Sequence, residues 1–223
     1  MVFNMSLRNE FEKNGRVWLR NAISEEDLLN LDEAAILEAK AGERVKTSSA
    51  LRAALTNQGS MMKAIATLDP AAKPVRVVAF NKTPTTNWGV PWHQDRVISV
   101  ARRHNVDGYS KWTRKSDVWH CEPPQQVLDE MLFVRVHLDD TDQSNGAMNI
   151  AVGSHNNGIV SASVAEETAH RFPIENCAAK RGDVLILKML TLHGSKPSKV
   201  PSNRRVFRID FASSELPAPL KWA

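Results

Sequence analysis

The chain contains few of the residues that build disulfide-rich or zinc-binding proteins. Its 223 residues include only two cysteines, Cys121 and Cys177, which give neither a disulfide framework nor a cysteine-based zinc spacing. Two isolated thiols are typical of a protein from a reducing compartment. The sequence therefore predicts a cytoplasmic protein rather than a secreted, cross-linked scaffold.

Long apolar runs and clusters of basic residues are also missing. No stretch approaches the roughly 18 apolar residues of a transmembrane helix, and the first charged residues, Arg8 and Glu10, precede any apolar run that could serve as a signal peptide. Lysine and arginine are scattered although the net charge is +4. A nucleic-acid-binding tail would concentrate them. We therefore expect neither a membrane nor a nucleic-acid partner.

The composition that remains is that of an ordinary globular protein, with 42% hydrophobic and 24% charged residues. A chain of this length is expected to form a single domain. Residues 1–73 are predicted to be helical cover with one strand. Ser24 is expected to cap a helix whose first turn carries acidic residues. The predicted helices lie at 5–13, 24–42, 49–55 and 61–68, and the strand at 15–20.

The pattern changes near Pro74, where strand-like segments begin to alternate with turn residues. Such spacing is typical of an antiparallel sandwich or barrel. Residues 99–126 are polar and have little periodicity, which predicts an irregular lid over a functional site. The strands are expected at 75–80, around His93, and at 131–139, 147–152, 184–190 and 204–211.

One short motif suggests a metal site. His93 and Asp95 are two residues apart, so they would share a face of an extended strand. Two histidines and one carboxylate, with open positions, are the ligands of non-haem Fe(II) oxygenases. The spacing does not identify the site by itself, because it also occurs at His120/Glu122 and His137/Asp139.

A distant histidine and two arginines extend this motif. His193 is expected to end a strand, and Arg204, eleven residues later, opens the last strand beside Arg205. Adjacent strand residues point to opposite faces. Arg205 shares its face with apolar residues, the pattern of a covered sheet surface: Phe207, Ile209 and Phe211. Arg204 shares its face with a more polar set suited to an active-site mouth: Val206, Arg208 and Asp210.

Taken together, these motifs resemble the phytanoyl-CoA dioxygenase-like family of Fe(II)/2-oxoglutarate oxygenases. The resemblance runs from about Val75 to the C-terminus. Its motifs are Asn87-Trp88, Trp92-His93-Gln94-Asp95, Leu138-Asp139-Asp140, Asn145-Gly146-Ala147, Gly153-Ser154-His155 with Gly158, Gly182-Asp183, His193-Gly194-Ser195, and Arg204.

The resemblance implies a mainly β fold, a double-stranded β-helix (a jelly roll, as in cupins) with N-terminal helices packed on one sheet. It implies that His93, Asp95 and His193 bind Fe(II), and that Arg204 and Ser195 hold the co-substrate 2-oxoglutarate. An arginine fork suits the far carboxylate of that molecule.

The expected reaction uses O₂ to hydroxylate an unactivated C–H bond of a small molecule, with release of succinate and CO₂. Halogenases of the family replace the carboxylate ligand with a small residue, so Asp95 favours hydroxylation. The alternative is a non-redox, cupin-like isomerase or small-molecule-binding protein, which would have no use for Arg204.

Substrate contacts are the least specified part of the prediction. The basic residues near 96–115 indicate either a solvated surface or an anionic substrate. His120 is either a surface-loop residue or a substrate contact. The candidates for substrate binding are Trp92, Arg96, His120 and Arg135.

Overall fold

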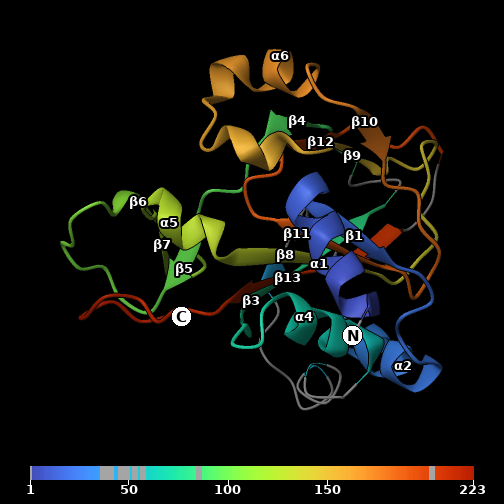
Figure 1. Cartoon of the computed structure of the whole chain (residues 1–223), viewed down its shortest axis with the longest axis horizontal. Coiled ribbons are helices and arrows are strands. Elements are labelled where there is room, and N and C mark those ends of the chain that lie inside the picture. The colour runs from blue at the N-terminus through green and yellow to red at the C-terminus, as the bar shows by residue number, and fades with distance from the viewer. Residues whose placement is uncertain are drawn as a thin grey trace.

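Two antiparallel sheets form the centre of the molecule, and a third, smaller sheet lies to one side of them (Figure 1). The computed structural model describes residues 2–35, 43–44, 51, 55, 59–83, 87–200 and 204–223. The large sheet contains, in spatial order, β1 (Arg16–Leu19), β11 (Val184–Lys188), β8 (Met131–His137), β13 (Arg204–Ala212), β3 (Lys73–Lys82) and β2 (Glu43–Arg44). The second sheet contains β10 (Ile174–Asn176), β9 (Met148–Ala151), β12 (His193–Ser195) and β4 (Val90–His93).

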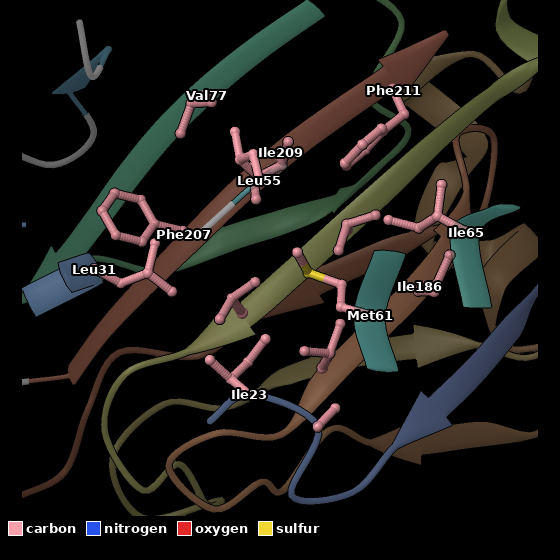
Figure 2. Close-up of a cluster of buried hydrophobic side chains, with 14 of the residues drawn as sticks. Ile23, Leu31, Leu55, Met61, Ile65, Val77, Ile186, Phe207, Ile209 and Phe211 are labelled. Carbon is pink, nitrogen blue, oxygen red and sulfur yellow. The ribbon is translucent and has the colours of Figure 1, made fainter. Parts of the chain in front are cut away.

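Helices cover one face of the large sheet, as predicted. Phe207, Ile209 and Phe211 alternate along β13 and are fully buried in a cluster with side chains of the N-terminal helices (Figure 2). Full burial of each such side chain stabilises the fold by roughly 1.5–3 kcal/mol. The covering helices are α1 (Val2–Asn14), α2 (Glu25–Ala34) and α4 (Ser60–Leu68). Because side chains alternate along a strand, the intervening residues of β13 point toward the second sheet.

The N-terminal helices begin close to where the sequence predicts. The Asp27 backbone N–H donates to Ser24 Oγ over 3.1 Å, which confirms the predicted cap of α2. The described part of this helix ends at Ala34. Its predicted continuation to residue 42, and most of the predicted helix at 49–55, lie outside the described residues.

The prediction of an irregular lid at 99–126 is wrong. This region forms the third sheet, in the order β5 (Ile98–Val100), β7 (Val118–Glu122) and β6 (Ser110–Lys115), followed by α5 (Gln125–Asp129). Val100 and Cys121 are buried beside Leu216 and Leu220 of the C-terminal segment, which lies next to this sheet (Figure 1). The apolar partners are about a hundred residues away in the chain, so local periodicity is weak.

The predicted strand through His193 is in fact two strands in different sheets. β11 ends at Lys188 in the large sheet, the Thr191 N–H closes a turn onto the Lys188 carbonyl over 3.1 Å, and β12 begins at His193 in the second sheet. The remaining short helices are η1 (Ser154–Asn157), η2 (Ala162–Val164) and α6 (Ala165–Ala169). Among the described residues, no helix has the length and apolar character needed to span a bilayer.

Candidate metal centre

Two histidines face each other across neighbouring strands. His193 of β12 is the direct register partner of His93 of β4, and the centroids of their rings are 4.3 Å apart. Asp95 follows β4 in a loop, with Oδ2 3.0 Å from His193 Nε2 and Oδ1 3.9 Å from His93 Nε2. Ligand atoms of all three residues lie within 4.8 Å of one another, and within the described part of the chain no other such group is found.

Hydrogen bonds decide which nitrogen of each ring faces the site. His93 Nδ1 lies 2.8 Å from the Pro91 carbonyl, and His193 Nδ1 lies 2.9 Å from the Thr191 carbonyl. A carbonyl only accepts, so each Nδ1 carries the proton and each Nε2 presents a lone pair to the site. Burial and the neighbouring His193 ring lower the pKa of His93, which favours the neutral ring that a metal needs.

Asp95 supplies the negative charge of the site. Burial alone would raise its pKa, but the Arg208 guanidinium outweighs that effect and holds the pKa of Asp95 well below its usual range. The carboxylate is therefore ionised at neutral pH. Two neutral imidazoles and one carboxylate fit an octahedral divalent metal with three open positions.

The three residues line a cavity of about 240 Å³ between the two sheets. Its lining includes two of the residues that the sequence placed on the co-substrate side, Arg204 and Ser195, and one substrate candidate, Arg135. The full set is Arg76, Phe80, Lys82, Trp88, Val90, His93, Asp95, Phe133, Arg135, Met148, His193, Gly194, Ser195, Arg204 and Arg208.

Arg204 is buried in this cavity without the partners that a guanidinium normally has. Only 4% of the residue is exposed, yet its Nε and Nη1 have no hydrogen-bond partner among the described residues. A buried charge without a partner is costly, so the position fits a residue that awaits an anion. Burial and the adjacent Arg135 lower the pKa of Arg204, although a guanidinium stays charged at neutral pH.

A buried lysine that the sequence reasoning missed lies beside Arg204. Lys82 ends β3 directly opposite Arg204, and its Nζ donates to the Lys196 carbonyl over 2.9 Å and to Ser195 Oγ over 3.3 Å. Burial, followed by repulsion from Arg204 and Arg135, lowers its pKa to about 8. No local signal identifies Lys82, because only the pairing of β3 with β13 brings it to the cavity.

Arg205 lies on the opposite face of β13, where alternation places it. Its Nε and Nη2 donate to the two oxygens of Asp139 over 2.9 and 2.8 Å, and Nη1 is 2.9 Å from Asp32 Oδ1 of α2. Arg205 therefore joins the sheet to its helical cover, at the edge of the face that carries Phe207.

The other substrate candidates are not brought to the cavity. Trp92 packs near Ala165 and Leu192 and against the His170 ring, Arg96 pairs with Glu122, and neither lines the cavity. Trp92 follows the strand alternation, which turns it away from the side of His93.

The rival histidines also lie away from the group of His93, Asp95 and His193. His120 is buried in the third sheet, with Nδ1 3.1 Å from the Val118 carbonyl. His137 lies against Trp18, with ring centroids 5.8 Å apart, and burial lowers its pKa to about 3. The structure thus groups His193 with His93 and Asp95, and not with either rival pair.

The backbone of β4 lies so close to Gly194 that it leaves little room for a side chain there. A Cβ on Gly194 would approach the Val90 carbonyl oxygen to 3.0 Å and the Trp92 nitrogen to 3.2 Å. Glycine lets β12 lie this close to β4, whereas a larger residue would require the β4 backbone to shift by a few tenths of an ångström. The His-Gly-Ser step therefore fits the strand contact that brings the two histidines together.

Comparisons with known proteins agree with this architecture. The family described as phytanoyl-CoA dioxygenase (PhyH) matches residues 11–206, and no curated protein sequence matches the chain. AviO1 from Streptomyces viridochromogenes Tue57 is 18% identical with a TM-score of 0.64, over 97% of this chain and 98% of that one.

Two further solved structures contain ligands. The epimerase SnoN, in complex with Fe³⁺, alpha ketoglutarate and nogalamycin RO, is 13% identical with a TM-score of 0.70, over 95% of this chain and 84% of SnoN. HygX from Streptomyces hygroscopicus, with nickel and 2-oxoglutarate bound, is 14% identical with a TM-score of 0.63, over 93% of this chain and 87% of HygX. At these identities the likeness shows a shared fold, and it confirms the predicted jelly roll.

Proposed function

Because the chain belongs to the phytanoyl-CoA dioxygenase family, we propose that it is an Fe(II)- and 2-oxoglutarate-dependent dioxygenase that hydroxylates an unactivated C–H bond of a small molecule. The reaction consumes O₂ and releases succinate and CO₂. One observation carries the proposal: the His93, Asp95 and His193 ligand atoms share a cavity with Arg204, whose Nε and Nη1 have no partner among the described residues.

The opposite charges in the cavity suit a molecule that binds both a metal and a cation. Iron, when bound, would activate O₂, and O₂ supplies the oxidising power of the reaction. His93, Asp95 and His193 would hold it on one face. Arg204 would grip the far carboxylate of 2-oxoglutarate, and the Ser195 hydroxyl would donate a second hydrogen bond to it.

The proposed outcome at the substrate is hydroxylation, because Asp95 occupies the position that halogenases of the family leave to a small residue. The fold also supports other chemistry, since the similar structure SnoN is described as an epimerase. Among the cavity residues, Arg135 has a buried Nε without a partner in the described residues. We infer that the substrate is a small molecule with an anionic group that binds the Arg135 guanidinium.

Both cysteines are buried and free. They are consistent with the reducing cytoplasm, where we expect the enzyme to act.

The decisive experiment measures conversion of 2-oxoglutarate to succinate by the purified protein, with and without Fe(II), in the presence of small carboxylic acids as candidate substrates. We expect succinate only when Fe(II) and O₂ are present. With ¹⁸O₂, hydroxylation predicts one labelled oxygen in the product and one in succinate. Binding of Fe(II) without any 2-oxoglutarate turnover would instead support the non-redox alternative.

A further inference from the structure

The carboxylate of Asp95 is placed by side chains rather than by sheet pairing. β4 ends at His93, so Asp95 lies beyond the last strand residue, in a loop. The prediction that Asp95 shares a strand face with His93 is therefore wrong in its reason, although the two side chains do meet. The charged group that fixes the Asp95 carboxylate is Arg208 of β13, whose Nη1 forms a close ion pair with Asp95 Oδ2.

Arg208 is itself held rigidly. Its Nε donates to Asp210 Oδ1 over 2.7 Å, and its Nη2 donates to Asp210 Oδ2 over 3.2 Å. The guanidinium also lies 4.4 Å from the centroid of the Phe133 ring. Arg208 and Asp210 are 5% and 1% exposed, so little solvent competes for these contacts. A planar fork bound on one edge and stacked on a ring has a single orientation, and this orientation aims Nη1 at Asp95.

We propose that Arg208 is the positioning residue that keeps Asp95 a one-oxygen ligand. This role rests on the proposed Fe(II) site. A carboxylate can bind a metal through one oxygen or two, and the ion pair with Arg208 engages one of the two Asp95 oxygens. Two-oxygen binding would occupy one of the three positions that the co-substrate and O₂ need. Arg208 therefore maintains the number of open positions at the metal, although it is not a ligand.

The test separates metal binding from co-substrate binding. Arg208→Met removes the ion pair, and Arg208→Lys keeps the charge but loses the fork. Fe(II) affinity and then 2-oxoglutarate affinity are measured without O₂, the latter from the absorption band of the iron–2-oxo acid chelate. We expect Arg208→Met to bind Fe(II) nearly as well as the wild type does, because all three proposed ligands remain, and to bind 2-oxoglutarate at least about tenfold more weakly, a loss of about 1.4 kcal/mol. Arg208→Lys should lie between.

Arg205→Met is the matched control, because Arg205 lies on the same strand but faces the helices, and it should leave both affinities unchanged. X-ray absorption of the iron-loaded proteins gives the binding mode of Asp95. One oxygen in the wild type and two in Arg208→Met support the proposal. Unchanged 2-oxoglutarate affinity in folded Arg208→Met overturns it. Weaker affinity with Asp95 still bound through one oxygen also overturns it, since Arg208 would then bind 2-oxoglutarate directly.

The wild type alone decides the question if Arg208→Met does not fold. In the iron-loaded crystal structure, Arg208 should remain on Asp95, with one Asp95 oxygen on the metal. Two oxygens on the metal, or Arg208 turned away, would refute the role. A wild type that binds no Fe(II) would remove the proposed function and this role with it, whereas normal Fe(II) binding in every variant with unchanged 2-oxoglutarate binding removes only this role.

Discussion

The two walls of the cavity carry opposite chemistry. The wall built by β4 and β12 presents His93, the following Asp95, and His193, whose lone pairs and negative charge suit a metal cation. The facing wall of the large sheet presents Lys82, Arg135, Arg204 and Arg208. Of these four, only Arg208 forms an ion pair with a carboxylate in the described part of the chain. A dianion with a metal-binding end is the kind of molecule that both walls can bind at once.

The difference between the walls lies in what completes each of them. The groups of the metal wall already have partners, because backbone carbonyls fix both imidazoles and Arg208 of the facing wall fixes the carboxylate. The cationic wall has unpaired donors on Arg204 and Arg135 within the described residues, so it waits for an anion. Substitutions on the first wall should therefore abolish metal binding, whereas substitutions on the second should weaken co-substrate binding by degrees.

The largest effect is expected on the metal wall. His93→Ala or His193→Ala removes one of the three proposed ligands and should abolish Fe(II)-dependent consumption of 2-oxoglutarate, with iron lost on metal analysis. His137→Ala and His120→Ala should retain iron, because neither histidine lies in the ligand group. If His137→Ala lost iron while His93→Ala kept it, the iron site would lie at β8 of the large sheet and not at β4.

The next largest effect is expected on the KM for 2-oxoglutarate, and it should differ between the two faces of β13. Arg204→Leu removes the buried cation proposed to hold 2-oxoglutarate. Losing one partner of such a charge pair costs about 2–5 kcal/mol, so the KM for 2-oxoglutarate should rise at least roughly thirtyfold. Arg205→Leu should leave that KM unchanged and lower the free energy of unfolding by about 1–3 kcal/mol, since it removes the guanidinium from the Asp139 and Asp32 carboxylates. Titration of 2-oxoglutarate and urea unfolding of both variants measure this, and a larger KM effect from Arg205→Leu would contradict the face assignment.

The pH dependence of kcat/KM tests whether Lys82 on the cationic wall binds 2-oxoglutarate. Its pKa in the free protein is lowered to about 8, so the ammonium is present below pH 8 and is lost as the pH rises through 8. A hydrogen bond to a charged group contributes about 1.5–3 kcal/mol, and the protonated fraction of Lys82 itself falls about tenfold between pH 7 and pH 9, so kcat/KM for 2-oxoglutarate should fall about five- to tenfold over this range.

In Lys82→Met this fall should be absent, with kcat/KM already low at pH 7. Lys180→Met, which alters an exposed lysine paired with Asp140, should keep the wild-type profile. An unchanged pH profile in Lys82→Met would exclude Lys82 from co-substrate binding.

The smallest effect is expected at Ser195, where the two walls meet. Ser195→Ala removes one neutral hydroxyl, worth about 0.5–1.5 kcal/mol, so the KM for 2-oxoglutarate should rise roughly two- to tenfold. Because Lys82 Nζ contacts Ser195 Oγ, the double variant with Lys82→Met should be non-additive. Additive effects would mean that the two side chains act separately, and Ser110→Ala, at an exposed position of β6, is the control.

Local patterns in the sequence predict much of this arrangement. The strand pattern after Pro74 and the family motifs indicated the jelly roll with helical cover, and the alternation along β13 separated Arg204 from Arg205. These features are local, because a strand's two faces and a helix cap are set by neighbouring residues. His93, Asp95 and His193 were named from motifs that the structure brings together, and their role as iron ligands stays a prediction.

Features that depend on partners distant in the chain could not be predicted from these local patterns. The third sheet at 98–122 draws its apolar cover from the C-terminal segment, so its own periodicity predicted an irregular lid. Lys82 reaches the cavity through the pairing of β3 with β13, and Arg208 reaches Asp95 across the space between the sheets. A sequence specifies which face of a strand a residue occupies, but which charges meet across that face depends on sheet pairing, and pairing is set by packing over the whole fold.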